Sequence, residues 1–235
     1  MNIDTNSEEV LSNDVLTITN NIEKNNDVKY RLYKIEKRVI DILASIIGII
    51  ALLPLTAIIW IANLFAKDNG PVFFKQERIG KNGKLFKLYK YRSMVINADD
   101  KLAKYLAENE AARKEYKKYK KLKNDPRITA IGKFIRKTSI DEFPQFINVL
   151  KGEMSLVGPR PYLPREIKDM GKSYNEIIKV KPGLTGLWQV NGRSDTTFKD
   201  RLRIDKEYIE KKSMKLDTKI FIWTFLKVFR KEGAK

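Results

Sequence analysis

Residues 39–65 read VIDILASIIGIIALLPLTAIIWIANLF, the only strongly apolar run in a chain of 235 residues. Asp41 is its one charged residue. The run is long enough for a helix that crosses a bilayer core about 30 Å thick, whereas the core helix of a soluble protein rarely stays apolar on all sides for this length. No signal-peptide start precedes it and no small-residue cleavage site follows it, so we expect it to be retained. The sequence therefore predicts a membrane segment.

Pro54 divides this run into two pieces, which at about 1.5 Å per residue would be roughly 22 Å and 16 Å long. Each is shorter than a bilayer core of about 30 Å. Basic residues flank the run on both sides: Lys29, Arg31, Lys34, Lys37 and Arg38 before it, and Lys67, Lys75, Arg78, Lys81 and Lys84 after it. Because positive charge marks the cytoplasmic side, both ends are expected there. This pattern favours a re-entrant helix-break-helix anchor, with a single kinked transmembrane helix as the alternative.

The composition restricts the chemistry. Lysine and arginine number 47 against 29 acidic residues, a formal net charge of +18 that predicts anionic partners. The chain has no cysteine and no histidine, which excludes disulfides, thiolate metal sites and the commonest hydrolase and zinc chemistries. A nucleophile, base or metal ligand must then come mostly from carboxylates, hydroxyls, amides or lysine.

The charge is unevenly distributed along the chain. Residues 1–27 hold six acidic residues and one lysine in a segment rich in Asn, Ser and Thr, which is typical of a mobile tail. We therefore expect three parts: an acidic tail at 1–30, the basic flank and membrane helix at 31–66, and a catalytic domain at 67–235.

Within the third part the expected elements are mostly helical. Asn82-Gly83, between the β-prone runs 72–74 and 85–92, predicts a β-hairpin. Residues 99–123 are expected to form one charged surface helix. Residues 216–229 are apolar but carry Lys219 and Lys227, which fits either a helix in the lipid headgroup region or a helix packed on the core. The predicted fold class is α/β, mostly helical with a small β-hairpin or sheet, in a monotopic membrane protein.

The most informative chemical stretch is residues 124–165, NDPRITAIGKFIRKTSIDEFPQFINVLKGEMSLVGPRPYLPR. Ser139 and Glu142 have the spacing of a capping box at a helix start, which is a purely structural interpretation. A helix start also favours anions, so the adjacent carboxylates of Asp141 and Glu142 could instead belong to a phosphate site.

Two arginines strengthen the second interpretation. Arg136 precedes Asp141 in a basic run, and Arg160 lies between Pro159 and Pro161. The prolines stiffen the backbone of Arg160, which suits a guanidinium that clamps phosphate oxygens. The alternative is a rigid surface turn with a solvated arginine.

Several motifs occur in one order along the chain: Lys37-Arg38, the 78–83 segment RIGKNG, the 89–94 segment YKYRSM, the 141–161 segment DEFPQFINVLKGEMSLVGPRP, and the 181–194 segment KPGLTGLWQVNGRS. Together they closely resemble the bacterial sugar transferase family, the monotopic polyprenyl-phosphate sugar-1-phosphate transferases, also called phosphoglycosyl transferases. The resemblance covers residues 33–229. Larger members carry several preceding transmembrane helices, so we expect this chain to be a minimal form.

The resemblance implies roles for individual residues. Asp141 would be the nucleophile that attacks the β-phosphate of a nucleoside-diphosphate sugar and carries the phosphosugar, and Glu142 would help to hold a magnesium ion, Mg²⁺. Arg136 and Arg160 match phosphate-contacting arginines. The further candidate binding residues for substrate or phosphate are Arg92, Gln189 and Arg193. Asp205, Tyr208, Ser213 and Asp217 match a downstream family pattern for which we assign no chemical role.

The expected reaction is transfer of hexose-1-phosphate from a UDP-sugar, galactose or glucose by a weak similarity, to undecaprenyl phosphate. It would start capsule, exopolysaccharide or glycan assembly on the cytoplasmic face of the bacterial inner membrane. Membrane lipids are expected partners, nucleic acid is not, and a homo-oligomer is left open. A membrane-tethered nucleic-acid binder and a non-catalytic membrane adaptor are the competing hypotheses. Many family members have Ser-Pro where this chain has Leu53-Pro54, and Thr56 is the candidate to replace that serine hydroxyl.

Overall fold

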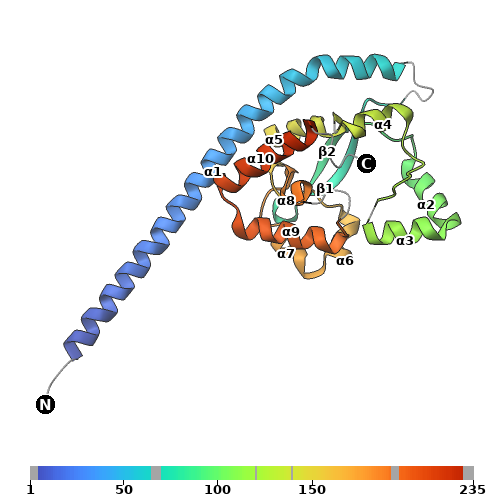
Figure 1. Ribbon diagram of the computed structural model, residues 1–235. Helices are drawn as coiled ribbons and strands as arrows, with labels where there is room; N and C mark the ends of the chain where they lie inside the picture. The colour runs from blue at the N-terminus through green and yellow to red at the C-terminus, as the bar shows by residue number, and fades with distance from the viewer. Residues whose placement is uncertain (1–4, 65–69, 120, 139, 192–195, 230–235) are drawn as a thin grey trace. The chain divides into compact units, whose positions relative to one another are not determined.

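The computed structural model describes residues 5–64, 70–119, 121–138, 140–191 and 196–229 (Figure 1). The chain divides into two compact units, residues 1–40 and residues 41–235, and each is described by itself. Helix α1 (Thr5–Leu64) begins in the first unit and ends in the second. Residues 5–40 are helical throughout, and the mobility expected for residues 1–30 stays a prediction.

The membrane run lies in the second half of α1. Among the described residues, one helical segment, Asp27–Ile61, is long and apolar enough to cross a membrane, and 17% of its most apolar window is buried in the protein. Pro54 is inside the helix, and α1 changes direction toward its C-terminal end (Figure 1). Proline causes such bends because it lacks an N–H and its ring crowds the preceding turn.

The carbonyl that Pro54 leaves without its usual partner is that of Ile50. Thr56 is not the replacement donor, because its hydroxyl donates to the carbonyl of Leu52 at 2.7 Å. The same hydroxyl is hydrogen-bonded to the hydroxyl of Tyr91. Thr56 therefore connects the bent part of α1 to Tyr91 of the domain that follows α1 in the chain.

Asp41 forms a second connection. Its side chain is 3% exposed, and its Oδ1 accepts hydrogen bonds from the Ser155 hydroxyl at 3.0 Å and from the Leu156 amide at 2.8 Å. The one charge of the apolar run is thus directed into the protein, which leaves the outer side of residues 42–61 apolar.

The predicted β-hairpin is confirmed. Strands β1 (Phe73–Ile79) and β2 (Leu85–Tyr91) are antiparallel, in a register from Phe73 opposite Tyr91 to Ile79 opposite Leu85. The turn contains a short 3₁₀ helix, η1 (Lys81–Gly83), in which Asn82 and Gly83 have φ of 58° and 75°. Asn and Gly adopt this left-handed conformation most readily, so the turn forms where the sequence places them.

A second, parallel pair of strands lies in the core: β3 (Ser155–Val157) and β4 (Gly183–Thr185). The main core cluster packs both strands against β2 and four helices: α5 (Phe146–Lys151), α8 (Leu187–Asn191), α9 (Phe198–Lys211) and α10 (Met214–Phe229). Its fully or nearly fully buried members include Leu88, Val149, Met154, Tyr208 and Ile220. This core fixes the positions of the loops at the ends of β3 and β4.

The remaining helices surround this core. Where one surface helix is predicted at 99–123, the structure has two, α2 (Ala98–Glu108) and α3 (Glu110–Tyr119). They are separated by Asn109, which has an extended backbone and whose Oδ1 accepts a hydrogen bond from the Ala112 amide at 2.9 Å. The other elements are α4 (Ala130–Lys137), η2 (Ile140–Gln145), η3 (Pro164–Glu166), α6 (Ile167–Met170), η4 (Gly171–Ser173) and α7 (Tyr174–Ile177).

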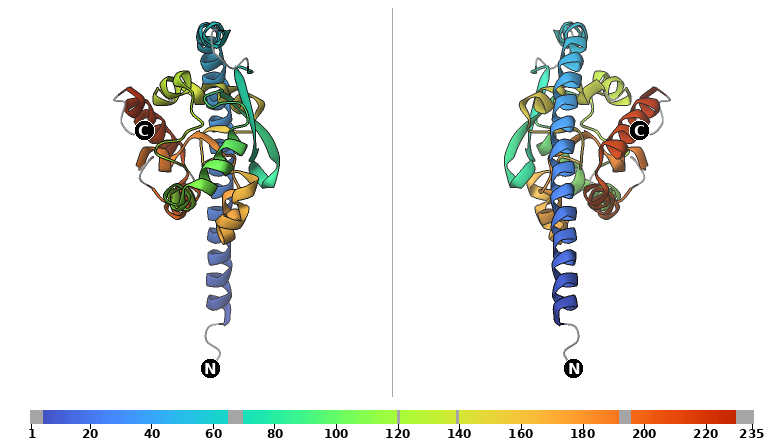
Figure 2. Two further views of the ribbon diagram at one scale, coloured as in Figure 1. Left: turned by 90° about the vertical axis from the view of Figure 1, so that its right-hand side faces the viewer. Right: turned by 90° about the vertical axis from the view of Figure 1, so that its left-hand side faces the viewer.

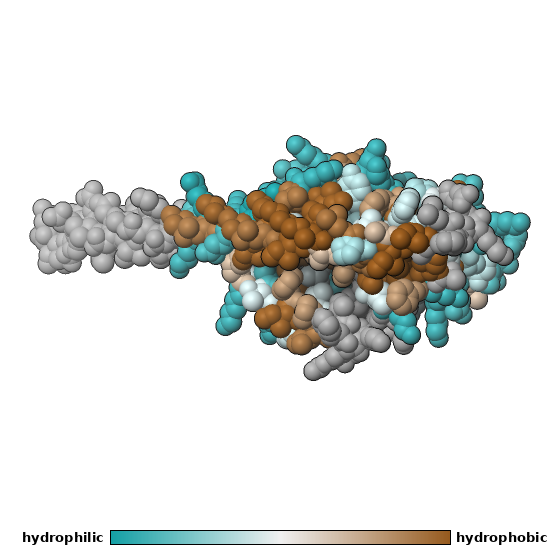
Figure 3. All heavy atoms as spheres, turned by 90° about the horizontal axis from the view of Figure 1, so that it is seen from above, coloured by the Kyte–Doolittle hydropathy of each residue, from teal (hydrophilic) through white to brown (hydrophobic). Residues whose placement is uncertain are grey.

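Helix α10 confirms that residues 216–229 pack on the core, and a place in the lipid headgroup region stays a prediction. One side packs on the core: Ile220 is fully buried, and the Thr224 hydroxyl is 2.7 Å from that of Thr185. The other side exposes large apolar residues: Phe221, Ile222, Trp223, Phe225 and Leu226. These residues and the exposed apolar side chains of residues 42–61 gather on one face of the second unit (Figure 3). The hairpin and α10 lie on opposite sides of this unit (Figure 2).

Candidate active site

Asp141 lies in η2, directly after α4, and is 7% exposed. Burial raises its pKa to about 6; the neighbouring charges of Lys90 and Arg136 lower that pKa, and Glu142 raises it. Asp141 is thus a carboxyl group removed from water but surrounded by charges that set its ionisation. A carboxylate whose pKa is shifted by burial and by specific charges is a candidate for chemistry.

Glu142 is more exposed than Asp141. Its Oε1 accepts a hydrogen bond from Lys90 Nζ at 2.7 Å, in an ion pair whose side chains are 24% exposed for Lys90 and 41% for Glu142. Lys90 comes from β2, so the hairpin supplies a cation to the carboxylate pair. Sequence reasoning did not assign Lys90 to the site, although it lies in the YKYRSM segment that carries part of the resemblance.

Arg136 is the next group. It is exposed in the last turn of α4, whose first turn is capped by the Thr129 hydroxyl, which accepts a hydrogen bond from the Gly132 amide at 2.9 Å. Its charge acts on Asp141. Three of the predicted site residues, Arg136, Asp141 and Glu142, therefore share one electrostatic environment, as their spacing suggests. The capping role of Ser139 lies outside the described residues.

Arg160 belongs to a neighbouring group at the end of β3. Its guanidinium lies 5.6 Å from the centre of the Trp188 ring, and its backbone amide donates to Asp205 Oδ2 at 3.2 Å. The charge of Arg78 interacts both with Arg160 and with Glu142. Burial lowers the pKa of Arg78 to about 9; the positive charge of Arg160 lowers this pKa further, and the negative charge of Glu142 raises it. Arg78 is thus electrostatically coupled to both groups.

The other predicted binding residues have different surroundings. Arg92 donates from Nε to the carbonyl of Pro71 at 2.9 Å and from Nη2 to that of Gly70 at 3.4 Å, so it holds the chain before β1. The Oε1 atom of Gln189 is buried and has no hydrogen-bond partner among the described residues. Arg193 lies outside the described residues.

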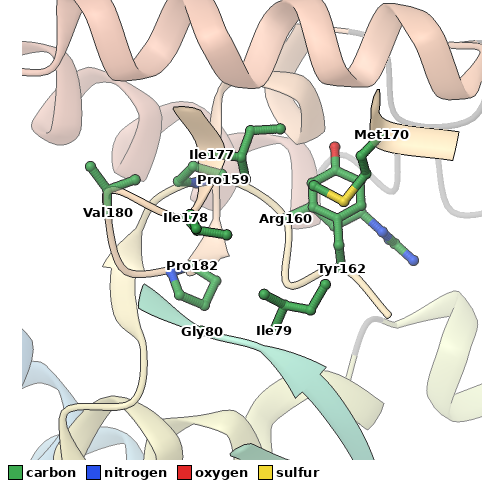
Figure 4. Close-up of a pocket in the computed structure, with 10 residues that line it drawn as sticks. All are labelled: Ile79, Gly80, Pro159, Arg160, Tyr162, Met170, Ile177, Ile178, Val180 and Pro182. Atoms are coloured by element: carbon green, nitrogen blue, oxygen red, sulfur yellow. The ribbon is translucent and has the colours of Figure 1, made fainter. Parts of the chain in front are cut away.

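A small, mostly apolar pocket lies beside the Arg160 group (Figure 4). Its lining includes Ile79, Tyr162, Met170 and Ile177, but neither Asp141 nor Glu142. In Figure 4 the Arg160 guanidinium points away from Val180 and Pro182. The pocket therefore lies next to the candidate site and does not contain its two carboxylates.

The carboxylate pair fits a magnesium ion. No cluster of three or more Asp or Glu side chains occurs in the described part of the chain, but Mg²⁺ is usually bound by one or two carboxylates, waters and substrate phosphates. The charge of Glu142 raises the pKa of Asp141, and a cation between the two groups would relieve that repulsion. Of the two carboxylates, Glu142 is the more exposed and would be the more accessible to a metal ion.

Comparison with known proteins identifies the family. A family model described as "Bacterial sugar transferase" matches residues 32–231. The chain belongs to the bacterial sugar transferase family. The match includes every predicted site residue and nearly all of the second unit, from the apolar part of α1 to α10.

Similar members of the sugar transferase family have informative names. The undecaprenyl-phosphate galactose phosphotransferase of Salmonella typhimurium is 44% identical over 220 residues, which are 94% of this chain and 44% of that protein. The exopolysaccharide production protein ExoY of Sinorhizobium fredii is 38% identical over 200 residues, 85% of this chain and 88% of ExoY. A UDP-glucose:undecaprenyl-phosphate glucose-1-phosphate transferase of Escherichia coli is 37% identical over 206 residues, 84% of this chain and 41% of the relative. The chain spans less than half the length of the Salmonella and Escherichia proteins.

Proposed function

We propose that this protein transfers a hexose-1-phosphate from a UDP-sugar to undecaprenyl phosphate and so starts the assembly of a capsule, exopolysaccharide or other glycan. The observation that carries the proposal is the buried Asp141 carboxyl beside Glu142, Lys90 and Arg136. The names of the relatives support the substrate class. Two of them name galactose or glucose as the sugar, and these are the two sugars we propose.

In the proposed reaction Asp141 acts as a nucleophile. One carboxylate oxygen attacks the β-phosphorus of the UDP-sugar, the bond from that phosphorus to the bridging oxygen breaks, and uridine monophosphate leaves with the electron pair. The phosphosugar is then held on Asp141 as an acyl phosphate. A phosphate oxygen of undecaprenyl phosphate attacks the same phosphorus, and the Asp141 carboxylate leaves. A carboxylate suffices because phosphoryl transfer depends more on positioning and charge neutralisation than on nucleophilic strength.

The neighbouring cations supply that neutralisation. Lys90 and Arg136 favour the ionised form of Asp141, and both would offset the charge of a diphosphate bound there. Arg160 would also bind phosphate oxygens, since its position over the Trp188 ring limits the freedom of its guanidinium. When bound at Glu142, Mg²⁺ would add further charge neutralisation for the leaving group.

We also propose on which side of the membrane each part of the chain lies. Residues 31–66 would form a re-entrant anchor with both ends in the cytoplasm, and residues 67–235 the catalytic part on the cytoplasmic face of the inner membrane. Two observations support it: the bend of α1 and the apolar face that residues 42–61 share with α10. Access to a lipid-linked acceptor requires such a surface close to the reacting carboxylate.

The test is a transfer assay with membrane fractions, radiolabelled UDP-galactose and UDP-glucose, and undecaprenyl phosphate. We expect wild-type protein to move label into the lipid phase and to release uridine monophosphate. Asp141→Asn should lose both this activity and the labelled protein adduct that can be trapped without acceptor. Turnover retained in Asp141→Asn would defeat the assignment of the nucleophile, and absence of transfer with every UDP-sugar would defeat the function.

A further inference from the structure

The loop after β3 carries Arg160, and each of its residues 158–162 is held through the backbone. The Gly158 amide donates to the Thr185 carbonyl at 2.9 Å, and the Pro159 carbonyl accepts from the Gly183 amide at 2.8 Å. Farther along, Arg78 Nη1 donates to the Pro161 carbonyl at 2.8 Å, and the Ile79 amide donates to the Tyr162 carbonyl at 2.9 Å. The two sheets thus hold this loop on both sides of Arg160.

The backbone of Arg160 itself is held by helix α9. Asp205 Oδ2 accepts the Arg160 amide at 3.2 Å and the Tyr162 hydroxyl at 2.8 Å. One carboxylate oxygen therefore bonds to Arg160 and to the residue two positions beyond it. Because prolines flank Arg160, these bonds fix the direction in which its side chain leaves the loop.

The buried carboxylate of Asp205 destabilises the folded state more than a purely structural contact would require. It is fully buried, and its second oxygen, Oδ1, has no hydrogen-bond partner among the described residues. A buried carboxylate with an unsatisfied oxygen lowers the free energy of unfolding. Burial accordingly raises the pKa of Asp205, while Tyr162 and the charges of Arg160 and Arg201 lower it.

Helix α9 also contacts the ring on which Arg160 stacks. One turn before Asp205, the guanidinium of Arg201 lies 5.4 Å from the centre of the Trp188 ring. Arg201 Nη2 donates to the Tyr119 carbonyl as well, so its own position is fixed. The backbone of Arg160 and the aromatic partner of its side chain are therefore both held by a single face of α9.

We propose that Asp205 is a positioning residue for the reaction: through the Arg160 amide and Tyr162 it sets the Arg160 guanidinium where it binds the phosphate groups of the nucleotide-sugar. The inference rests on the proposed function and goes beyond it, because it assigns a role to a fully buried residue outside the carboxylate pair. It also explains why a carboxylate is kept at a position where an apolar side chain would fold with less cost.

The test is a double-mutant cycle between Asp205 and Arg160. Asp205→Leu removes the acceptor at similar volume, Asp205→Asn keeps an oxygen acceptor, and Arg160→Ala removes the guanidinium. We expect Asp205→Leu to lower kcat/KM roughly 10- to 100-fold, Asp205→Asn to restore most of that loss, and Asp205→Leu to have little further effect in the Arg160→Ala background. Should the leucine variant not fold, Asp205→Ala, which also removes the acceptor, takes its place in the cycle.

Tyr208→Phe is the matched control. Tyr208 lies one turn farther along α9, is 2% exposed, and donates to Asp217 at 2.7 Å and to the Val157 carbonyl at 3.3 Å, away from Arg160. It should lower the melting temperature but show no kinetic coupling to Arg160. The proposal is overturned if the effects of Asp205→Leu and Arg160→Ala on kcat/KM simply multiply, or if Tyr208→Phe couples to Arg160 as strongly as Asp205→Leu.

Calorimetry with inorganic pyrophosphate and Mg²⁺ separates this inference from the proposed function. Suppose that no UDP-sugar is transferred, but that Asp205→Leu weakens pyrophosphate binding only when Arg160 is present. The proposed function is then wrong and the positioning role stands. If transfer occurs and neither transfer nor pyrophosphate binding shows the coupling, the function stands and the positioning role is wrong.

Discussion

At the scale of single residues, Asp141 shows what a buried carboxyl costs the protein. An aspartate in an unfolded chain has a pKa of about 3.9, and burial raises that of Asp141 to about 6. Between these values the folded state holds a proton that the unfolded state has released. The free energy of unfolding therefore falls as the pH rises from about 4 to about 6, and the loss persists at higher pH.

Asp141→Asn removes this cost. In metal-free protein with EDTA, we expect the variant to exceed wild type in free energy of unfolding by on the order of 2 kcal/mol near pH 7.5, and to match it near pH 4. Denaturant unfolding at the two pH values measures the difference. An advantage of the same size at both pH values would show that the buried charge is not its cause.

Lys90 is the second case at this scale. Its ion pair with Glu142 and its charge beside Asp141 predict that Lys90→Met lowers the rate of sugar-phosphate transfer roughly 10- to 100-fold, as expected for the loss of a charge that stabilises the transition state. Lys87→Met is the control, because Lys87 is exposed on the same strand opposite Glu77. Equal losses in the two variants would contradict a specific role for Lys90.

The sequence predicts the residues of this site unequally. Asp141, Glu142 and Arg136 lie close together in the chain, so local spacing is enough to group them. Lys90 reaches the same carboxylates only because η2 packs against β2, and Asp205 reaches Arg160 only because α9 packs against the loop after β3. Such contacts between distant segments depend on tertiary packing, which neither periodicity nor spacing in a single sequence reports.

At the scale of elements, the contact between α1 and β2 combines apolar packing of Leu52 and Ile59 around Tyr91 with one hydrogen-bonded pair. Tyr91 is 1% exposed, and its hydroxyl is bonded to Thr56. Thr56→Val leaves that hydroxyl buried without a partner, so we expect it to lower the free energy of unfolding by about 1–3 kcal/mol. Adding Tyr91→Phe should recover much of the loss, because both polar groups are then gone.

Thermal and denaturant unfolding of the two single variants and the double variant in detergent micelles tests this pair. A double variant that is less stable than either single variant would show that Thr56 and Tyr91 act independently. Tyr91→Phe keeps the ring that stacks on Phe73 at 5.4 Å, so the cycle isolates the hydroxyl contact from the aromatic one.

The elements also differ in how far sequence predicts them. Asn82-Gly83 located the hairpin because its turn needs positive φ, and those two residues adopt it. The single helix predicted at 99–123 is two helices in the structure, because Asn109 has an extended backbone and caps the second of them. The helix-favouring composition of this stretch does not reveal such a break. Strands β3 and β4 are only three residues each, too short for a period-two pattern to distinguish them from loops.

At the scale of the whole molecule, two features of the sequence act together. The formal net charge of +18 favours binding to an anionic membrane surface, and the apolar residues 42–61 would supply the inserted segment. Asp41, the one charge that would oppose insertion, is directed into the protein by Ser155 and Leu156. These features predict membrane association for a re-entrant and for a transmembrane path alike.

The absence of cysteine makes that path measurable. Val28→Cys and Ile96→Cys each introduce one thiol at an exposed position, 49% and 53% exposed, one before and one after the apolar run. If both ends are cytoplasmic, an impermeant maleimide should label neither thiol in intact spheroplasts and both in inside-out vesicles. Denatured samples control for thiol reactivity. A transmembrane path would place the two positions on opposite sides, so Val28→Cys labelled in spheroplasts while Ile96→Cys stays protected would contradict the re-entrant anchor.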